Sequence, residues 1–234
     1  MRVPLEIAAA QPLTLSDDVA GNALRHAAAV RAARARVVVF PEMSLTGYEL
    51  DAPGIGVGDP RLVPIVEACR ETGSIALVGG PVATDGGDSH IGIFAIDGDG
   101  VRIAYRKMWL GGAEPDHFAP GTAPTVLEAD GWRLGLAVCK DTGVPRHAAD
   151  TAALGMDAYV AGVLETMADA GVPDERARRV AADHGVWVVI ASFAGSTGGG
   201  FDEAAGGSGV WAADGSAVAR AGTEPGEIVR ATLI

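Results

Sequence analysis

The sequence predicts a layered α/β protein that forms one domain over residues 1–234. Apolar runs typical of buried strands alternate with segments that carry helix caps and helical spacing. Gly-containing turns separate further pairs of apolar runs and predict hairpins. No stretch has the composition of a linker, a repeat or a low-complexity region. Because helices must cover an apolar sheet and hairpins need a partner face, a layered sandwich in one domain satisfies both demands.

The first part of the chain alternates strands with helices. We expect strands at 5–10, 36–40 and 74–79, and helices at 16–34 and 59–72. Ser16 is the expected N-cap of the first helix, with Asp17 and Asp18 in its first turn, where carboxylates suit the helix dipole. Pro60 near the start and Gly73 after the end bound the second helix.

The second part combines hairpins with further helix–strand units. We expect hairpins at 90–105, 124–138 and 208–220, helices at 145–154 and 174–184, and strands at 158–161 and 186–191. The hairpin turns fall at 97–100, 130–131 and 214–215, where Asp and Gly favour tight reversal. Gly185 ends the last helix.

The composition argues against several classes of partner. The chain carries 18 Lys and Arg against 30 Asp and Glu, a formal charge of −12, and no basic cluster suited to a phosphate backbone. Such a chain repels nucleic acids and anionic membranes. No window reaches the roughly 18 apolar residues of a membrane span, and no signal-peptide pattern opens the sequence. We therefore expect a cytoplasmic protein without nucleic-acid or membrane partners.

The two cysteines predict neither a disulfide framework nor a metal site. Cys69 lies in a helical segment and is expected to be a small core residue. Cys139 closes the apolar run 132–138 and is followed at once by the polar, turn-rich run 140–145. That pattern places a thiol at the carboxyl end of a strand. Taken alone, Cys139 would also fit a core position.

Two other expected strands end in complementary chemistry. Glu42 follows the run 37–41, and Lys107 follows the run 101–106. Ligands and reactions collect outside the carboxyl ends of strands in an open α/β sheet. Glu42 can take the proton of the Cys139 thiol, and Lys107 can stabilise an oxyanion together with the backbone N–H of Lys140. The three strand ends therefore predict a site for thioester chemistry.

Taken together, these segments resemble the nitrilase superfamily, the carbon–nitrogen hydrolases. The matching segments are 40–48, 105–110, 136–141 and the late hairpin 209–215. The resemblance implies that Glu42, Lys107 and Cys139 are the catalytic glutamate, lysine and nucleophile. Glu114 stands where many members carry a second, supporting glutamate, although it also fits an ordinary acidic loop.

The resemblance implies a four-layer αββα sandwich and no metal or organic cofactor. It implies a hydrolase that cleaves a non-peptide C–N bond of a small molecule through a Cys thioester. An amide substrate is expected ahead of a nitrile, because amidase-type members are the broader part of the family. Members commonly pair outer helices into dimers or larger assemblies, so a homodimer or higher homo-oligomer is expected here.

Several residues near these positions have two possible roles. Tyr48, Trp109 and His117 are expected either to line the substrate pocket or to pack structurally. Lys140 is a further candidate for substrate binding. It contributes its backbone amide, or it forms a local ion pair with Asp141.

Other polar residues stand further from the motifs. His147 and His184 are expected on a helix surface or at a helix end. The acids Glu49, Asp51 and Glu165 hint at a cationic or amine-bearing substrate, although loop acids are usually just solvated.

Two other functions fit the same residues. An acyltransferase would pass the thioester acyl group to an amine or alcohol instead of water. A catalytically degenerate scaffold would keep the fold alone. The scaffold alternative is motivated by departures from the family pattern at Lys140, at Arg146 and over 160–165, which also leave the substrate open.

Overall fold

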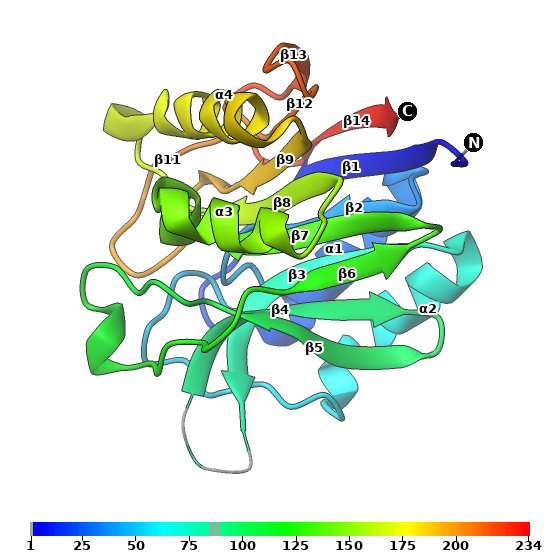
Figure 1. Ribbon diagram of the computed structural model, residues 1–234. Coiled ribbons are helices and arrows are strands. Elements are labelled where there is room, and N and C mark those ends of the chain that lie inside the picture. The colour runs from blue at the N-terminus through cyan, green and yellow to red at the C-terminus, as the bar shows by residue number, and fades with distance from the viewer. Residues whose placement is uncertain (1, 85–86, 88) are drawn as a thin grey trace.

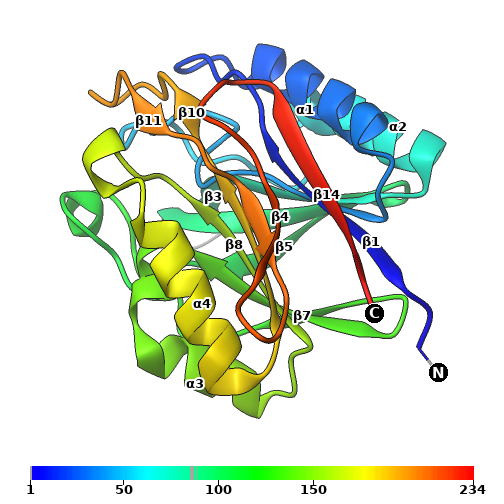
Figure 2. The same cartoon turned by 90° about the horizontal axis from the view of Figure 1, so that it is seen from above.

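Two sheets face each other, and helices cover the outer face of each (Figure 1). The computed structural model describes residues 2–84, 87 and 89–234. The first sheet has the strand order β14-β1-β2-β3-β4-β5, and the second has the order β13-β12-β9-β8-β7-β6. Helices α1 and α2 lie on one outside face, and α3 and α4 lie on the other (Figure 2). The expected four-layer αββα sandwich is confirmed.

The elements have the following bounds. The first sheet contains β1 (Leu5–Gln11), β2 (Val37–Val39), β3 (Ile75–Ala83), β4 (Ser89–Asp97), β5 (Gly100–Arg106) and β14 (Glu227–Leu233). The second contains β6 (Val126–Ala129), β7 (Trp132–Val138), β8 (Ala158–Val163), β9 (Trp187–Ser192), β12 (Gly209–Trp211) and β13 (Ala217–Arg220). A small separate pair joins β10 (Ala194–Gly195) to β11 (Ala204–Ala205). The helices are α1 (Val19–Ala33), α2 (Val63–Thr72), α3 (Pro145–Ala153) and α4 (Val172–His184).

Strand direction brings several carboxyl ends to one edge. The neighbours β1, β2 and β3 are parallel, as are β7, β8 and β9. Strand β5 is antiparallel to β4, which is antiparallel to β3, so β5 ends at the same edge as β3. Chain segments that follow β2, β5, β7 and β8 can therefore meet.

The core follows the two-residue alternation of the strands. Val37 and Val39 point between the sheets, where they join Leu136 and Val160 of the second sheet in one buried cluster. Val38 points the other way, into the cluster that packs against α1 and α2. Alternate faces of a strand that is covered on both sides are both apolar, which explains the unbroken valine run.

The start of α1 differs from the sequence-based expectation. Asp18, not Ser16, is the N-cap, and its carboxylate accepts a hydrogen bond of 2.9 Å from the backbone N–H of Gly21. The Ser16 hydroxyl instead donates to Glu49. Ser and Asp are both good N-caps, so the sequence alone does not decide which residue of the run 16–18 caps the helix. Contacts with other parts of the fold decide it. The predicted end of α2 is correct, since Gly73 adopts φ 69°.

Strand β14 was absent from the expected elements. It pairs antiparallel with β1 from Leu5↔Leu233 to Gln11↔Glu227, so both ends of the chain lie side by side (Figure 2). Its side chains are partly exposed at one edge of the sheet, which leaves little apolar signal in the sequence. Among the described residues, no helix has the length and apolarity that crossing a bilayer requires.

Candidate active site

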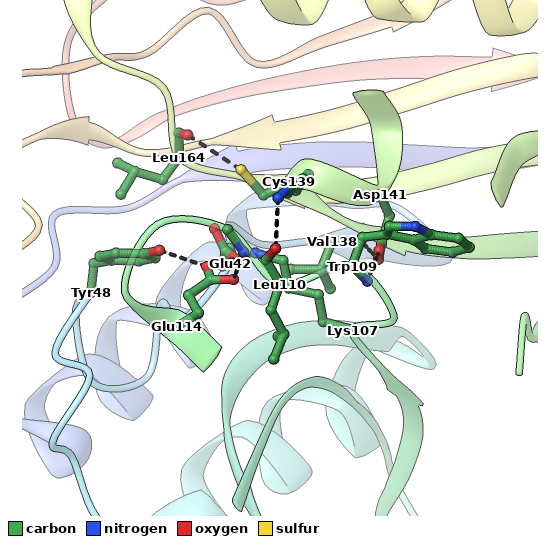
Figure 3. A network of polar contacts seen from close by, with 12 residues as sticks. Glu42, Tyr48, Lys107, Trp109, Leu110, Glu114, Val138, Cys139, Asp141 and Leu164 are labelled. Atoms are coloured by element: carbon green, nitrogen blue, oxygen red, sulfur yellow. Dashed lines mark hydrogen bonds and ion pairs between the residues drawn. The ribbon is translucent and has the colours of Figure 1, made fainter. Parts of the chain in front are cut away.

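The residues singled out at three strand ends meet in one buried polar cluster (Figure 3). Glu42 follows β2, Lys107 follows β5 and Cys139 follows β7. The Lys107 ammonium donates to Glu42 Oε1 at 2.6 Å. Lys107 also donates to Glu114 Oε1 at 2.7 Å, and both carboxylates are almost fully buried. One cation therefore joins two carboxylates in the interior.

The Glu42 turn sits between the two sheets because glycines make room for it. A Cβ on Gly79 of β3 would lie 2.3 Å from the Pro41 carbonyl oxygen. On the opposite side, a Cβ on Gly162 of β8 would lie 2.8 Å from the Glu42 nitrogen. Contacts that short with backbone atoms are not tolerated, so both strands need glycine here. Glu42 is thereby held by its backbone, and its Oε2 has no hydrogen-bond partner among the described residues.

Cys139 stands at a sharp turn between β7 and the 3₁₀ turn η3 (Cys139–Gly143). Its φ is +40°, a left-handed value that is costly for a residue with a Cβ. The thiol is half-buried, and it donates to the Leu164 carbonyl oxygen just after β8, at 3.5 Å. Strained turns of this kind collect at functional sites, because they present a side chain that a regular strand would not.

Asp141 anchors the Cys139 turn to the segment that follows Lys107. It is fully buried and accepts hydrogen bonds from the Val138 N–H and the Trp109 N–H, each at 2.9 Å. Its Oδ2 also accepts from the Tyr105 hydroxyl at 2.8 Å. The same carboxylate thus fixes both sides of the cluster. The alternative of a Lys140–Asp141 ion pair is wrong.

His147 extends this network and corrects another expectation. It is fully buried in α3, not on the helix surface. Its Nε2 lies 2.8 Å from the Tyr105 hydroxyl, and its Nδ1 lies 2.7 Å from the Tyr159 hydroxyl. Burial lowers the pKa of His147, and the nearby Asp141 charge opposes this. His184 lies at the end of α4, as expected. Sequence reasoning missed the His147 network because its two tyrosine partners come from two separate strands, β5 and β8.

Burial sets the protonation of the cluster. Burial raises the pKa of Glu42 to about 7, although the Lys107 charge pulls it down. Burial, followed by the Glu42 charge, raises the pKa of the Cys139 thiol well above its usual value. Burial alone would lower the pKa of Lys107, but attraction to Glu42, to the ionised form of Cys139 and to Glu114 outweighs burial and raises that pKa. The resting site is thus a neutral thiol, an ammonium ion and a carboxylate that is ready to accept a proton near neutral pH.

Glu114 is held from several sides. Its Oε1 also accepts from the Tyr48 hydroxyl at 2.6 Å, and its Oε2 accepts from the Gly111 N–H at 2.7 Å. Burial, followed by the Glu42 charge, raises the pKa of Tyr48, so this hydroxyl stays a donor. Glu114 therefore belongs to the cluster, and Tyr48 reaches the cluster through it.

The other candidate residues have identifiable contacts. The Trp109 ring packs edge-on against His147, with centroids 5.5 Å apart. His117 Nδ1 lies 3.1 Å from Asp51, which itself is on the surface. Lys140 donates from Nζ to the Leu110 carbonyl oxygen at 2.7 Å. A substrate-binding role for Tyr48, Trp109, His117 and Lys140 stays a prediction. Within the described ranges, no group of three or more His, Cys, Asp or Glu side chains is placed to share a metal ion.

Comparison with known proteins defines the class of enzyme. Residues 6–233 match the family model of the carbon-nitrogen hydrolases. The chain belongs to this family and is a carbon–nitrogen hydrolase.

Particular relatives agree with that assignment. The chain is 31% identical to a hydrolase encoded in the pqqF 5′ region of Pseudomonas protegens, over 98% of this chain and 81% of the relative. It is 28% identical to an (R)-stereoselective amidase of a Pseudomonas species, over 53% of this chain and 46% of that protein.

Solved structures share the fold. The CN-hydrolase superfamily protein XC1258 of Xanthomonas campestris has a TM-score of 0.89 at 20% identity, covering 99% of this chain and 91% of its own. Nit3 of Saccharomyces cerevisiae, from the nitrilase superfamily, has a TM-score of 0.86 at 22% identity, covering 98% and 90%. An amidase of Nesterenkonia AN1 has a TM-score of 0.85 at 24% identity, again covering 98% and 90%.

Replacement of Gly162 tests how the Glu42 turn is seated. Gly162→Ala forces backbone atoms of two elements apart, because the new Cβ would lie 2.6 Å from the Phe40 carbonyl oxygen. We expect the free energy of unfolding in urea to fall by about 1–3 kcal/mol. Gly171→Ala is the matched control, since Gly171 has φ −82° and open space around its Cβ position. Equal stability of the two variants would contradict the close approach.

Replacement of Asp141 tests the anchor of the Cys139 turn. Asp141→Asn turns an amide group toward N–H donors, so at least one buried hydrogen bond to a charged group is lost. We expect a loss of about 2 kcal/mol in the free energy of unfolding. Asp150→Asn in α3 is the control, because Asp150 is about half exposed and pairs with the exposed Arg146. A similar loss of unfolding free energy in both variants would contradict the role of Asp141 in anchoring the Cys139 turn.

Proposed function

We propose that the chain is an amidase-type hydrolase in which Cys139 is the nucleophile, Glu42 the general base and acid, and Lys107 the oxyanion-stabilising cation. One observation supports this most strongly: a buried carboxylate and a buried ammonium lie in contact beside a thiol on a strained turn. Glu114 holds Lys107 in place, so it is assigned a supporting role.

Acylation follows from the protonation of the cluster. Glu42 takes the proton of the Cys139 thiol as sulfur attacks the carbonyl carbon of the amide. The carbonyl oxygen gains negative charge, which the Lys107 ammonium and the Lys140 backbone N–H stabilise. The C–N bond then breaks, and the protonated Glu42 gives its proton to the leaving nitrogen. A thioester on Cys139 and a free amine or ammonia result.

Deacylation uses the same groups with water in place of the thiol. Glu42 takes a proton from water as its oxygen attacks the thioester carbon. Lys107 again stabilises the oxyanion, and the C–S bond breaks. The Cys139 thiolate recovers a proton from Glu42, and a carboxylic acid is released. Because the pKa of Glu42 is raised to about 7, this carboxylate can serve near neutral pH both as a base and, once protonated, as an acid.

We propose amides ahead of nitriles as substrates because two of the relatives are named amidases. The Pseudomonas relative is named an (R)-stereoselective amidase, and the Nesterenkonia protein is an amidase, of which a glutamate-to-glutamine mutant shows acrylamide added at the active-site cysteine. An intact buried cluster also favours a hydrolase over a catalytically degenerate scaffold. Release of the acyl group to hydroxylamine instead of water would identify acyl transfer. Assembly into a homodimer or larger homo-oligomer stays a prediction.

Removal of the thiol tests the proposed function. Ammonia release is measured over a panel of small amides, ureas, N-carbamoyl compounds and nitriles. We expect Cys139→Ala and Glu42→Gln each to lower turnover by on the order of 10³-fold or more while the fold is retained. Cys69→Ala is the control, because this second cysteine is buried in another part of the core. Full activity of Cys139→Ala would rule the mechanism out.

The pH dependence tests the role of Glu42. Because this carboxylate must be unprotonated to act as base and its pKa is raised to about 7, kcat/KM should fall as pH drops below about 7. Well below that pKa, kcat/KM should decrease tenfold for each pH unit. Circular dichroism at each pH controls for unfolding. A rate that stays constant from pH 8 down to pH 5 would contradict a base with this pKa.

A further inference from the structure

Glu165 stands next to the nucleophile but takes no part in the mechanism above. It directly follows Leu164, whose carbonyl oxygen accepts the Cys139 thiol hydrogen at 3.5 Å. It also follows β8, which ends at the same edge as β7. The altered sequence after Tyr159 therefore places an acidic residue directly after the carbonyl group that the reacting sulfur contacts.

The carboxylate of Glu165 is poorly solvated, and its charge is only partly balanced. Its side chain is 13% exposed and pairs with Arg176 of α4 at 3.0 Å through Oε1. Arg176 also donates to the Thr142 hydroxyl at 3.3 Å, so its charge is shared. Burial still raises the pKa of Glu165 despite the opposing Arg176 charge. An additional cation at this carboxylate would offset the remaining cost of burial.

The position of Leu164 indicates which part of a substrate faces Glu165. In the view of Figure 3, Leu164 approaches the Cys139 sulfur from the side away from Lys107 and Glu114. The leaving nitrogen must lie on the side of Glu42, which supplies its proton. The acyl substituent is then directed toward Leu164 and the residue that follows it.

We infer that Glu165 forms a subsite for an ammonium or other cationic group on the acyl part of the substrate. This inference rests on the proposed function for the direction of the acyl group. The subsite joins a carboxylate, a neighbouring guanidinium and the end of β8, all from this chain. A substrate cation there lies beside Arg176 without displacing it, because Arg176 occupies Oε1 and leaves Oε2 available.

The opposite assignment, a substrate carboxylate on Arg176, is less well supported. The guanidinium already donates to Glu165 and Thr142, and its plane lies against Gly143, where a Cβ would be 3.1–3.2 Å from guanidinium atoms. Besides Arg176, the charges that act on Glu165 are the carboxylate of Asp169 and the ammonium of Lys107. An anion would therefore have to compete with Glu165 for a guanidinium that is already paired.

The test uses thiol reagents that differ in charge, so it does not depend on amide hydrolysis. Aminoethyl methanethiosulfonate carries an ammonium, its propyl analogue is a neutral isostere, and the sulfonatoethyl analogue is an anion. Each forms a disulfide with Cys139 and releases methanesulfinate. Rates are divided by those for 2-mercaptoethanol, and labelling of Cys139→Ala corrects for Cys69.

We expect the cationic reagent to modify Cys139 about tenfold faster than the neutral one, as for one hydrogen bond to a charged group. Glu165→Gln keeps the shape and the acceptor for Arg176, and should abolish most of that preference. Glu175→Gln makes the same charge change on the exposed face of α4 and should retain it. An unchanged preference in Glu165→Gln, or faster labelling by the anion, would overturn the subsite.

Amide hydrolysis by the same variants separates the two proposals. If β-alaninamide is favoured over butanamide in the wild type and not in Glu165→Gln, the subsite acts in turnover. If Cys139 hydrolyses both amides equally in every variant, the subsite is wrong and the hydrolase stands. If the reagents show the charge preference but no amide is hydrolysed, the subsite stands and the amidase proposal fails.

Discussion

The buried Lys107 ammonium, held between Glu42 and Glu114, is the interaction on which the rest of the site depends. Transfer of a lone charge into a protein interior costs several kcal/mol, so a buried ammonium needs partners at close range. Here both carboxylates lie within 2.7 Å. Burial of Glu42, together with the charge of Glu114, outweighs the pull of the Lys107 charge, so the pKa of Glu42 is raised to about 7 instead of being depressed by the ion pair. A stronger ion pair would make Glu42 a poorer base.

The fold supplies this geometry through backbone contacts more than through side chains. Gly79 and Gly162, one from each sheet, let the Glu42 turn lie between the sheets. Asp141 joins the Cys139 turn to the segment after Lys107 by accepting two backbone N–H groups. Such contacts fix main-chain positions, and the reactive side chains then have few alternative orientations. The sandwich is therefore part of the chemistry, since no single sheet brings these turns together.

The sequence was sufficient for the layered fold and for the main members of the cluster. Alternating apolar runs predicted the strands, and residues just after those runs proved to meet in space. Contacts between segments that are distant in the chain could not be predicted from the sequence. His147 looks like any polar residue in a short helix, and only the packing of α3 against β5 and β8 shows its two tyrosine partners. Strand β14 was missed because an edge strand with exposed side chains leaves a weak pattern.

A covalent intermediate is the central claim, and detection of the acyl-enzyme tests it most directly. A slowly hydrolysed amide is mixed with the enzyme, the reaction is quenched in acid during turnover, and the peptide that contains Cys139 is analysed by mass spectrometry. We expect this peptide to gain the mass of the substrate minus ammonia, and the corresponding peptide of Cys139→Ala to gain none. Turnover without an adduct at Cys139, or with an adduct on another residue, would contradict it.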